Sequence, residues 1–329
     1  MSNCHKPCKN LSSKLVSVNC EPMKNNVPFT QGKLIESIKY IPTKTATHKI
    51  LRAVTNQCSR WKTKGGEKTS REIKDYIEQY GIDWEEAEKC ENSGSVEECA
   101  AQFETKNDFF QRHLSPDKIK INLDDKYDET CLISPADCRL VAYKHVHDAT
   151  KYWIKGKGFT VDKLLGHKVV KGNKLSTSYV DGTLIVCRLA PDDYHRFHFP
   201  INCTYMGSYE IKGEYYSVDP KIVNSKIDAF GDNKREVHIL YNENFGNVLC
   251  VIVAATCTGS IEMDPKLKIG NEYMKGSPFG TFGFGGSTIV MLFPKRFKIR
   301  LCKIFLNNSY ANVETYIRVG TKLGNSYSN

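Results

Sequence analysis

The stretch KGSPFGTFGFGGSTIVMLF, residues 275–293, indicates the local fold more clearly than any other part of the chain. It ends in the apolar run TIVMLF, which is typical of a buried β-strand. Five glycines precede that run, and glycine permits the backbone angles that a strained or closely approached peptide requires. Further β-rich runs, such as TLIVCRL and NVLCVIVAAT, occur after about Leu132 and are separated by Gly, Pro, Asp and Asn. We therefore expect the last two thirds of the chain to form a mainly β domain.

The N-terminal third has a helical pattern instead. In SREIKDYIEQYG, residues 70–81, Ser70 can cap a helix and Gly81 can end it. The residues that share one face of this helix are Ile73, Tyr76, Ile77 and Tyr80. A second helical stretch, residues 83–114, is interrupted near residues 92–94. The predicted fold class is α+β, with a polar leader and helical N-terminal region over residues 1–105 and a β-rich domain over residues 106–329.

Charge and hydropathy narrow the class of protein. The chain of 329 residues has a formal net charge of +10, which favours an anionic partner such as nucleic acid, an acidic membrane surface or a charged substrate. Its longest apolar run, residues 248–255, is far shorter than the roughly 20 residues of a membrane-spanning helix. Residues 1–10 lack the apolar core of a secretory signal. The first arginine is Arg52, which argues against an arginine-rich mitochondrial presequence. We therefore expect a cytoplasmic protein with no signal peptide or transmembrane helix.

The cysteines predict neither a disulfide framework nor a metal centre. There are 13 of them, without regular spacing and without a CxxC motif, so reduced thiols are expected. Cys4, His5 and Cys8 have the chemistry of metal ligands, but no second ligand pair follows at finger-like spacing. A frayed terminus is the better interpretation of these three residues, and no metal site is predicted.

The glycine-rich stretch is the first candidate for chemistry. It matches neither GxxxxGK[ST] nor GxGxxG, and it is not the GxSxG elbow of hydrolases. Both a phosphate-binding loop and an ordinary serine hydrolase are therefore disfavoured. What remains is a reactive Ser287 after Gly286, or a glycine-rich hairpin with a buried serine and no chemistry.

Two other segments carry titratable residues in unusual settings. APDDYHRFHFP places His195 and His198 around Arg196, and a buried histidine needs a hydrogen-bond partner. ISPADCRLV places Asp137 in a turn between apolar stretches, where an aspartate is often only a turn former. Together with Ser287 these residues have the composition of a nucleophile, a base and an orienting carboxylate.

These motifs also occur together in a known family. NDFFQRHL (107–114), SPAD (134–137), PDDYHRFHFP (191–200), ATCTGSI (255–261) and GGSTIVMLF (285–293) appear in the order and spacing of phosphatidylserine decarboxylase proenzymes. The chain resembles the soluble, long-leader branch of that family. The likeness spans residues 107–293 and is most specific in DYHRxH followed by GST.

The resemblance implies a self-processing, pyruvoyl-dependent decarboxylase. Ser287, with His198 as base and Asp137 orienting it, would cleave the chain after Gly286 and become a pyruvoyl group. That group would form a Schiff base with phosphatidylserine and release CO2 and phosphatidylethanolamine. His195 would protonate the resulting carbanion.

Some positions depart from the family pattern, and other functions stay open. Cys138 and Cys203 replace glycines that are usual there, and Ala254 and Thr258 alter the strand before Gly259. One alternative is a decarboxylase of a free amino acid such as tryptophan on the same scaffold. The other is a non-catalytic basic binding protein, although no nucleic-acid-binding motif is recognisable.

The segment PKRFKIRL suggests a surface for the substrate's membrane. Arg296, Lys298 and Arg300 should face away from the core on one side of a strand, either as a solvated basic face or in contact with anionic headgroups. The expected partners are phosphatidylserine and an anionic membrane surface, to which the protein would bind peripherally. No nucleic-acid partner is expected. The large chain (1–286) and the small chain (287–329) should remain associated, and a homodimer is left open.

Overall fold

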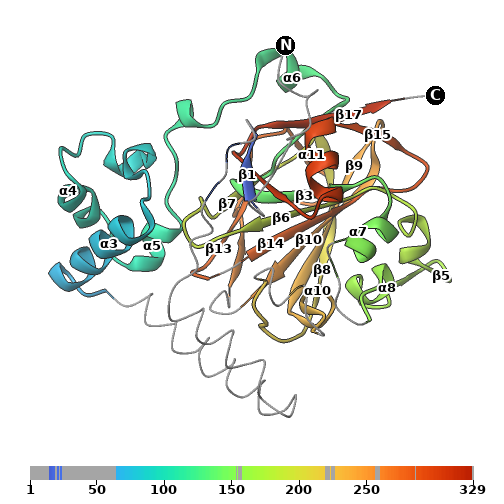
Figure 1. Cartoon of the computed structure of the whole chain (residues 1–329), viewed down its shortest axis with the longest axis horizontal. Coiled ribbons are helices and arrows are strands. Elements are labelled where there is room, and N and C mark those ends of the chain that lie inside the picture. The colour runs from blue at the N-terminus through green and yellow to red at the C-terminus, as the bar shows by residue number, and fades with distance from the viewer. Residues whose placement is uncertain are drawn as a thin grey trace.

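The computed structural model describes residues 15–18, 21, 23, 64–152, 154, 158–218, 223, 227–255, 260–285 and 287–327. Its main feature is a sheet of nine described strands (Figure 1). In spatial order these are β1 (Leu15–Ser17), β16 (Glu314–Ile317), β3 (Cys138–Tyr143), β6 (Leu184–Leu189), β14 (Ser287–Leu292), β10 (Gly246–Ala254), β9 (Arg235–Asn242), β8 (Cys203–Ile211) and β12 (Glu272–Tyr273). Only the β1–β16 pair among them is parallel.

The sheet is covered on both faces because its side chains alternate between two apolar cores. In β14, Ile289 and Met291 belong to one core, whereas Val290 and Leu292 belong to the other. Small sheets close the first core; their strands are β11 (Ile261–Met263), β13 (Pro278–Phe282) and β7 (Arg196–His198), then β15 (Lys298–Leu301), β17 (Lys322–Tyr327) and β2 (Cys131–Ile133). Helices α7 (Val146–Tyr152), α8 (Val161–Leu164) and α10 (Ala229–Asp232) contribute to the second core.

The remaining described elements are short. They are η4 (Pro116–Lys118), α6 (Leu123–Tyr127), the β4 (Val169–Val170) and β5 (Asn173–Lys174) pair, η5 (Leu175–Ser178) and α11 (Lys303–Tyr310). Helix α11 packs on β3 and β16, and its Ser309 hydroxyl accepts a hydrogen bond from the Ala142 amide.

A helical region lies beside the glycine-rich segment, on the side of the sheet away from α7 and α8 (Figure 1). It contains α3 (Glu67–Tyr80), η2 (Trp84–Glu86), η3 (Glu88–Cys90), α4 (Val96–Ala101) and α5 (Lys106–Phe110). These elements share an apolar cluster of their own, which includes Ile73, Tyr76 and Phe109. The α+β fold class is therefore confirmed, and the boundary at residues 105/106, which falls directly before α5, stays a prediction.

Two helical details differ from the expectation. Gly81 does end α3 in the left-handed conformation, but Ser70 is not its cap, because the helix begins at Glu67 after Gly66. The stretch 83–114 is not one interrupted helix. Ser95 and Thr105 each accept a hydrogen bond from an amide three residues ahead, and so each begins a new short helix.

The expectation of reduced thiols is wrong for one pair of cysteines. Cys90 and Cys99 form a disulfide within the helical region. The free cysteines of the described part of the chain are all buried: Cys131, Cys138, Cys187, Cys203, Cys250 and Cys302. The candidate ligands Cys4, His5 and Cys8 lie outside the described residues, within which no acidic, histidine and cysteine cluster suits a metal ion.

None of the helices in the described ranges is both long and apolar enough to cross a membrane.

Candidate functional site

Ser287 begins the strand β14 at the centre of the large sheet. It pairs with Leu189 of β6 on one side and with Ala254 of β10 on the other. Its side chain is buried, and its Oγ has no hydrogen-bond partner within the described residues. A buried hydroxyl without a partner is unfavourable, which makes Ser287 a candidate for chemistry. Within the described part of the chain, the same is true of the buried hydroxyls of Ser115, Thr288 and Ser326, which have no partner either.

The segment before Ser287 is attached to the helical region. The Phe284 amide donates a 3.0 Å hydrogen bond to Oδ1 of Asn107, and the Phe284 ring packs edge-on against Phe110 and Tyr76. Gly285 has φ 142°, a conformation that favours glycine, and Gly286 lies outside the described residues. Phe284, shortly before the expected cut, is thus in contact with the helical region.

His195 has one ring nitrogen whose lone pair has no partner within the described residues. Its Nε2 donates to the Ala190 carbonyl at 2.9 Å, which requires the proton on Nε2 and leaves a lone pair on the buried Nδ1. Nδ1 has no partner within the described residues. The ring stacks on Phe110 with the centroids 3.8 Å apart, and burial lowers the pKa of His195 to about 3.

His198 has both ring nitrogens engaged. Nδ1 donates to the Gly276 carbonyl at 2.9 Å, so Nε2 accepts from the Tyr194 hydroxyl at 3.1 Å. Burial lowers the pKa of His198 to about 4, against the opposing effect of the Gly276 carbonyl. Both histidines are therefore neutral near pH 7.

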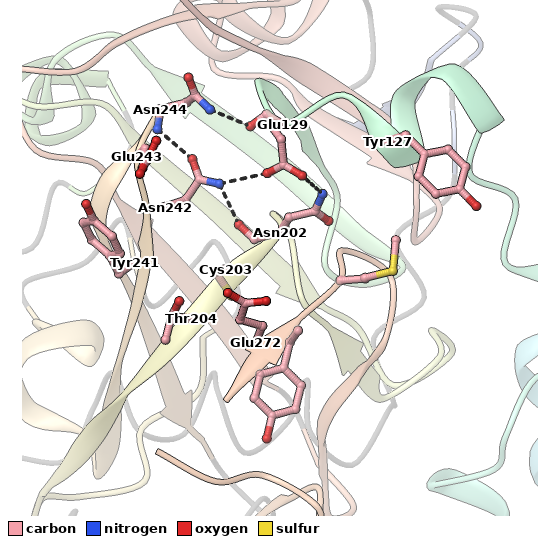
Figure 2. A pocket seen from close by; sticks show the side chains of 12 residues that line it. Tyr127, Glu129, Asn202, Cys203, Thr204, Tyr241, Asn242, Glu243, Asn244 and Glu272 are labelled. Atoms are coloured by element: carbon pink, nitrogen blue, oxygen red, sulfur yellow. Dashed lines mark hydrogen bonds between the residues drawn. The ribbon is translucent and has the colours of Figure 1, made fainter. Parts of the chain in front are cut away.

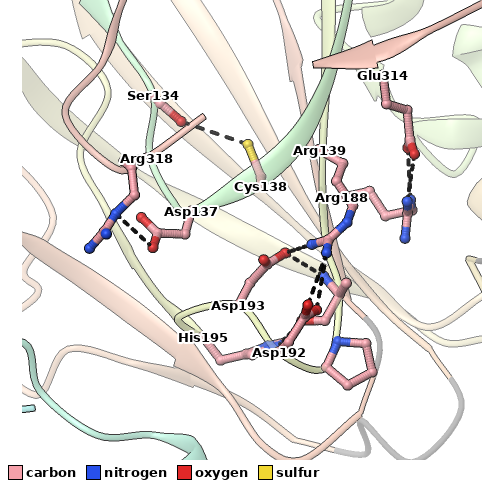
Figure 3. A network of polar contacts seen from close by, with 12 residues as sticks. Ser134, Asp137, Cys138, Arg139, Arg188, Asp192, Asp193, His195, Glu314 and Arg318 are labelled. Atoms are coloured by element: carbon pink, nitrogen blue, oxygen red, sulfur yellow. Dashed lines mark hydrogen bonds and ion pairs between the residues drawn. The ribbon is translucent and has the colours of Figure 1, made fainter. Parts of the chain in front are cut away.

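Asp137 lies directly before β3 and is held by the C-terminal part of the chain. Its Oδ1 accepts a 2.7 Å hydrogen bond from the Val319 amide, and its Oδ2 pairs with Nε of Arg318 at 3.3 Å (Figure 3). Burial raises the pKa of Asp137, while Arg318 and the Val319 amide oppose that shift.

Asp137 also lines a cavity of about 340 Å³ between the sheet and the helical region. Its charged walls include Arg139, which bonds to both Asp192 and Asp193, and Arg318, which bonds to Asp137 (Figure 3). Arg318 also bonds to Glu86. The remaining polar groups on its walls are Tyr80, Asp83, Arg112, Tyr194 and Tyr316.

The predicted site residues meet at one end of the sheet, but not through direct hydrogen bonds. His195 is bonded to Ala190, the neighbour of Leu189, which pairs with Ser287. His198 is bonded to Tyr194, which shares the cavity with Asp137. Within the described residues no hydrogen bond joins Ser287, the two histidines and Asp137 to one another.

Asn107, Arg112 and Tyr194 were not predicted to be functional. All three lie inside motifs that carry the family resemblance, NDFFQRHL and PDDYHRFHFP. The signal that was available is their position within those motifs. What they contact depends on the packing of distant segments.

The family departures at Cys138 and Cys203 fall in the sheet. The Cys138 thiol is buried beside the Ser134 hydroxyl at 3.7 Å, and Cys203 begins β8. In β15 and the turn before it, Ile299 and Leu301 are buried, whereas the three basic residues of the segment, Arg296, Lys298 and Arg300, are exposed. The predicted alternation of this strand is confirmed.

A second pocket of about 700 Å³ opens at the other end of the sheet, where β8, β9 and β12 meet (Figure 2). Glu129 on its wall accepts hydrogen bonds from the side-chain amides of Asn202 and Asn242. None of the predicted catalytic residues lines this pocket.

The family model for phosphatidylserine decarboxylase matches residues 106–325. A phosphatidylserine decarboxylase proenzyme of Fusobacterium nucleatum is 35% identical over 257 residues, 78% of this chain and 79% of that protein. One of Clostridium novyi is 40% identical over 225 residues, 68% of this chain and 72% of that protein. The rice protein named phosphatidylserine decarboxylase proenzyme 2 is 40% identical over 240 residues, but the chain covers only 37% of its length. The chain belongs to the phosphatidylserine decarboxylase family, whose members are carboxy-lyases.

Proposed function

We propose that this enzyme decarboxylates phosphatidylserine with a pyruvoyl group that it makes from Ser287. The observation that carries the proposal is the buried, unpartnered hydroxyl of Ser287, at the start of a central strand and directly after a glycine-rich segment. Family membership supplies the substrate class.

The first reaction is a cut in the chain itself. A base removes the proton of the Ser287 hydroxyl, Oγ attacks the Gly286 carbonyl carbon, and the peptide bond becomes an ester with a free amine at residue 287. Loss of the Cα proton of residue 287 then expels the carboxylate of Gly286. The dehydroalanine left behind becomes pyruvoyl by adding water and releasing ammonia.

Two histidines are candidates for the base, and they rest on different grounds. Resemblance to the family implies His198, with Asp137 as the orienting carboxylate. His195 is favoured because its Nδ1 has no partner within the described residues, while its Nε2 is bonded to Ala190, the neighbour of the strand partner of Ser287. We propose His198 as the base for cleavage and His195 as the proton donor after decarboxylation, and single substitutions of each decide the order.

The cleaved serine position suits its second task. A ketone at position 287 would supply the electron sink that amino-acid decarboxylation needs, which no ordinary side chain provides well. Phe110 stacked on His195 shields this end of the sheet from water. Exclusion of water limits loss of the transferred proton to solvent and prevents side reactions.

The two chains should stay together after the cut. The small chain of 43 residues would contain β14, β16 and β17, and β14 pairs along its whole length with β6 and β10 of the large chain. We also propose that the exposed Arg296, Lys298 and Arg300 meet anionic headgroups at a membrane surface.

Replacing Ser287 tests the proposal. Intact-mass analysis of the wild-type protein should show a small chain that starts with pyruvoyl, and Ser287→Ala should remain a single chain of about 37.3 kDa that releases no CO2 from phosphatidylserine. Ser277→Ala, in the same glycine-rich stretch, is the matched control and should be cut normally. Normal cleavage of Ser287→Ala would refute the assignment. Release of CO2 from tryptophan but not from phosphatidylserine would show that the substrate is a free amino acid.

A further inference from the structure

Arg112 is a buried cation without a bonded counterion. It is 6% exposed, and its Nε and Nη1 have no hydrogen-bond partner within the described residues. The contact that the structure gives its guanidinium is with the face of the Phe109 ring, 5.1 Å from the centroid. Burial lowers the pKa of Arg112, yet an arginine remains charged at neutral pH.

The acids around Arg112 are bonded to other cations. Asp192 and Asp193 bond to Arg139, and Asp137 and Glu86 bond to Arg318. Asp83, the other acid on the cavity wall, is exposed to solvent. Arg112 is therefore the one guanidinium of the described cavity wall that no carboxylate binds.

Leaving a desolvated charge unpaired is unfavourable unless an anion arrives from outside the chain. Arg112 lines the cavity that Asp137 also lines, and the chain closes around it from α3, β3 and β16. An anionic group in that cavity could accept hydrogen bonds from Nε and Nη1 of Arg112, which have no partner within the described residues.

We infer that Arg112 binds a phosphate-type anion in this cavity, and that this anion is the phosphodiester of the phosphatidylserine headgroup. The identity of the ligand rests on the proposed function. The site itself rests on the unpaired guanidinium and the cavity.

The reaction chemistry distinguishes phosphate from carboxylate. Pairing Arg112 with the carboxylate that leaves as CO2 would stabilise the ground state and lose that interaction in the transition state, which opposes the reaction. The phosphodiester keeps its charge throughout. Its contact with Arg112 holds the substrate without affecting the barrier.

The acidic groups of the wall favour a headgroup over a free anion. Asp83 and Asp192 would repel any anion, but the ammonium of the headgroup offsets one of its two negative charges, so they should repel glycerophosphoserine less than inorganic phosphate. The site should therefore prefer glycerophosphoserine to inorganic phosphate.

Binding is best measured on the uncut, full-length Ser287→Ala protein, where no turnover occurs. Arg112→Gln in that background should weaken the affinity for glycerophosphoserine, measured by calorimetry, by about 10- to 100-fold, as expected for a lost charge-assisted hydrogen bond. Arg112→Lys should recover part of the affinity. Arg71→Gln, which removes the same charge from an exposed position on α3, should leave the affinity unchanged.

A merely structural arginine would behave differently. In the absence of ligand, Arg112→Gln should melt no lower than its parent, because it removes a desolvated charge to which no carboxylate is bonded, and it should lose the melting shift that glycerophosphoserine produces. A lower melting temperature with unchanged affinity would overturn the inference. Equal loss of serine binding would assign Arg112 to the carboxylate, and inorganic phosphate bound as tightly as glycerophosphoserine would exclude the headgroup.

Kinetics connect the site to the reaction. In the otherwise wild-type, processed enzyme, Arg112→Gln should raise KM for phosphatidylserine with little change in kcat. If the wild-type enzyme released no CO2 from phosphatidylserine while glycerophosphoserine still bound through Arg112, the proposed function would fail and the anion site would stand.

Discussion

The large sheet and the helical region contribute to the site in different ways. In the sheet, strand pairing fixes the residues that carry the chemistry: Asp137 before β3, and Ser287 at the start of β14 between two partners. The helical region holds no predicted catalytic residue, yet it binds the segment before the cut through Asn107 and gives the cavity its Arg112. The sheet side thus both supplies and fixes the reactive groups, whereas the helical region holds the segment before the cut and lines the cavity.

The largest expected effect lies on the sheet side. Asp137→Asn and His198→Ala should each slow the cut by about 100-fold or more, because the hydroxyl loses its activated base. The rate is measured as the appearance of two chains on a denaturing gel. His195→Ala should be cut substantially but release little CO2. An uncut His195→Ala beside a normally cut His198→Ala would reverse the two histidines, as the free Nδ1 of His195 suggests.

A smaller effect is expected on the helical side. Asn107→Ala removes the acceptor of the Phe284 amide and should slow the cut by about three- to tenfold, the equivalent of one ordinary hydrogen bond. Asn107→Asp keeps an acceptor oxygen and should be cut faster than Asn107→Ala. Equal rates for both variants and the wild type would mean that the helical region does not position the segment.

The smallest expected effect is the response of the cut to pH. With pKa values of about 3 for His195 and about 4 for His198, either base is neutral above pH 5, so the rate should vary less than about twofold between pH 5.5 and 8 and fall toward pH 4. The unfolded chain binds protons that the folded one excludes, so stability should also fall as pH drops from about 6.5 toward 4. A rate that follows a pKa near 6.5 would place the base in a more hydrated setting.

Local patterns in the sequence predicted the elements better than their contacts. The apolar run after Ser287 predicted β14, and Gly81 marks the end of α3, because both signals act over a few residues. Ser70 had the chemistry of a cap but lies one turn inside the helix. Ser95 and Thr105 divided a helix that the pattern had joined.

The site itself required long-range packing. Arg318 holds Asp137 from 181 residues away, and Asn107 reaches Phe284 across 177. The unpartnered atoms of Arg112 and Ser287 are two examples among several buried polar atoms without a partner in the described part of the chain, and such burial depends on the whole fold, so neighbouring residues in the sequence do not predict it. The Cys90–Cys99 pair was missed because the spacing of the cysteines, by itself, does not reveal which of them meet.

The central position of β14 in the sheet determines the order of folding and self-cleavage. A strand that begins at the cut and pairs on both sides must be placed before the cut is made, so folding comes first and the chemistry second. Once cut and then unfolded, the two pieces would have to find each other again, and recovery would depend on their concentration. The mature enzyme would therefore keep a shape that only its continuous precursor could reach by a unimolecular route.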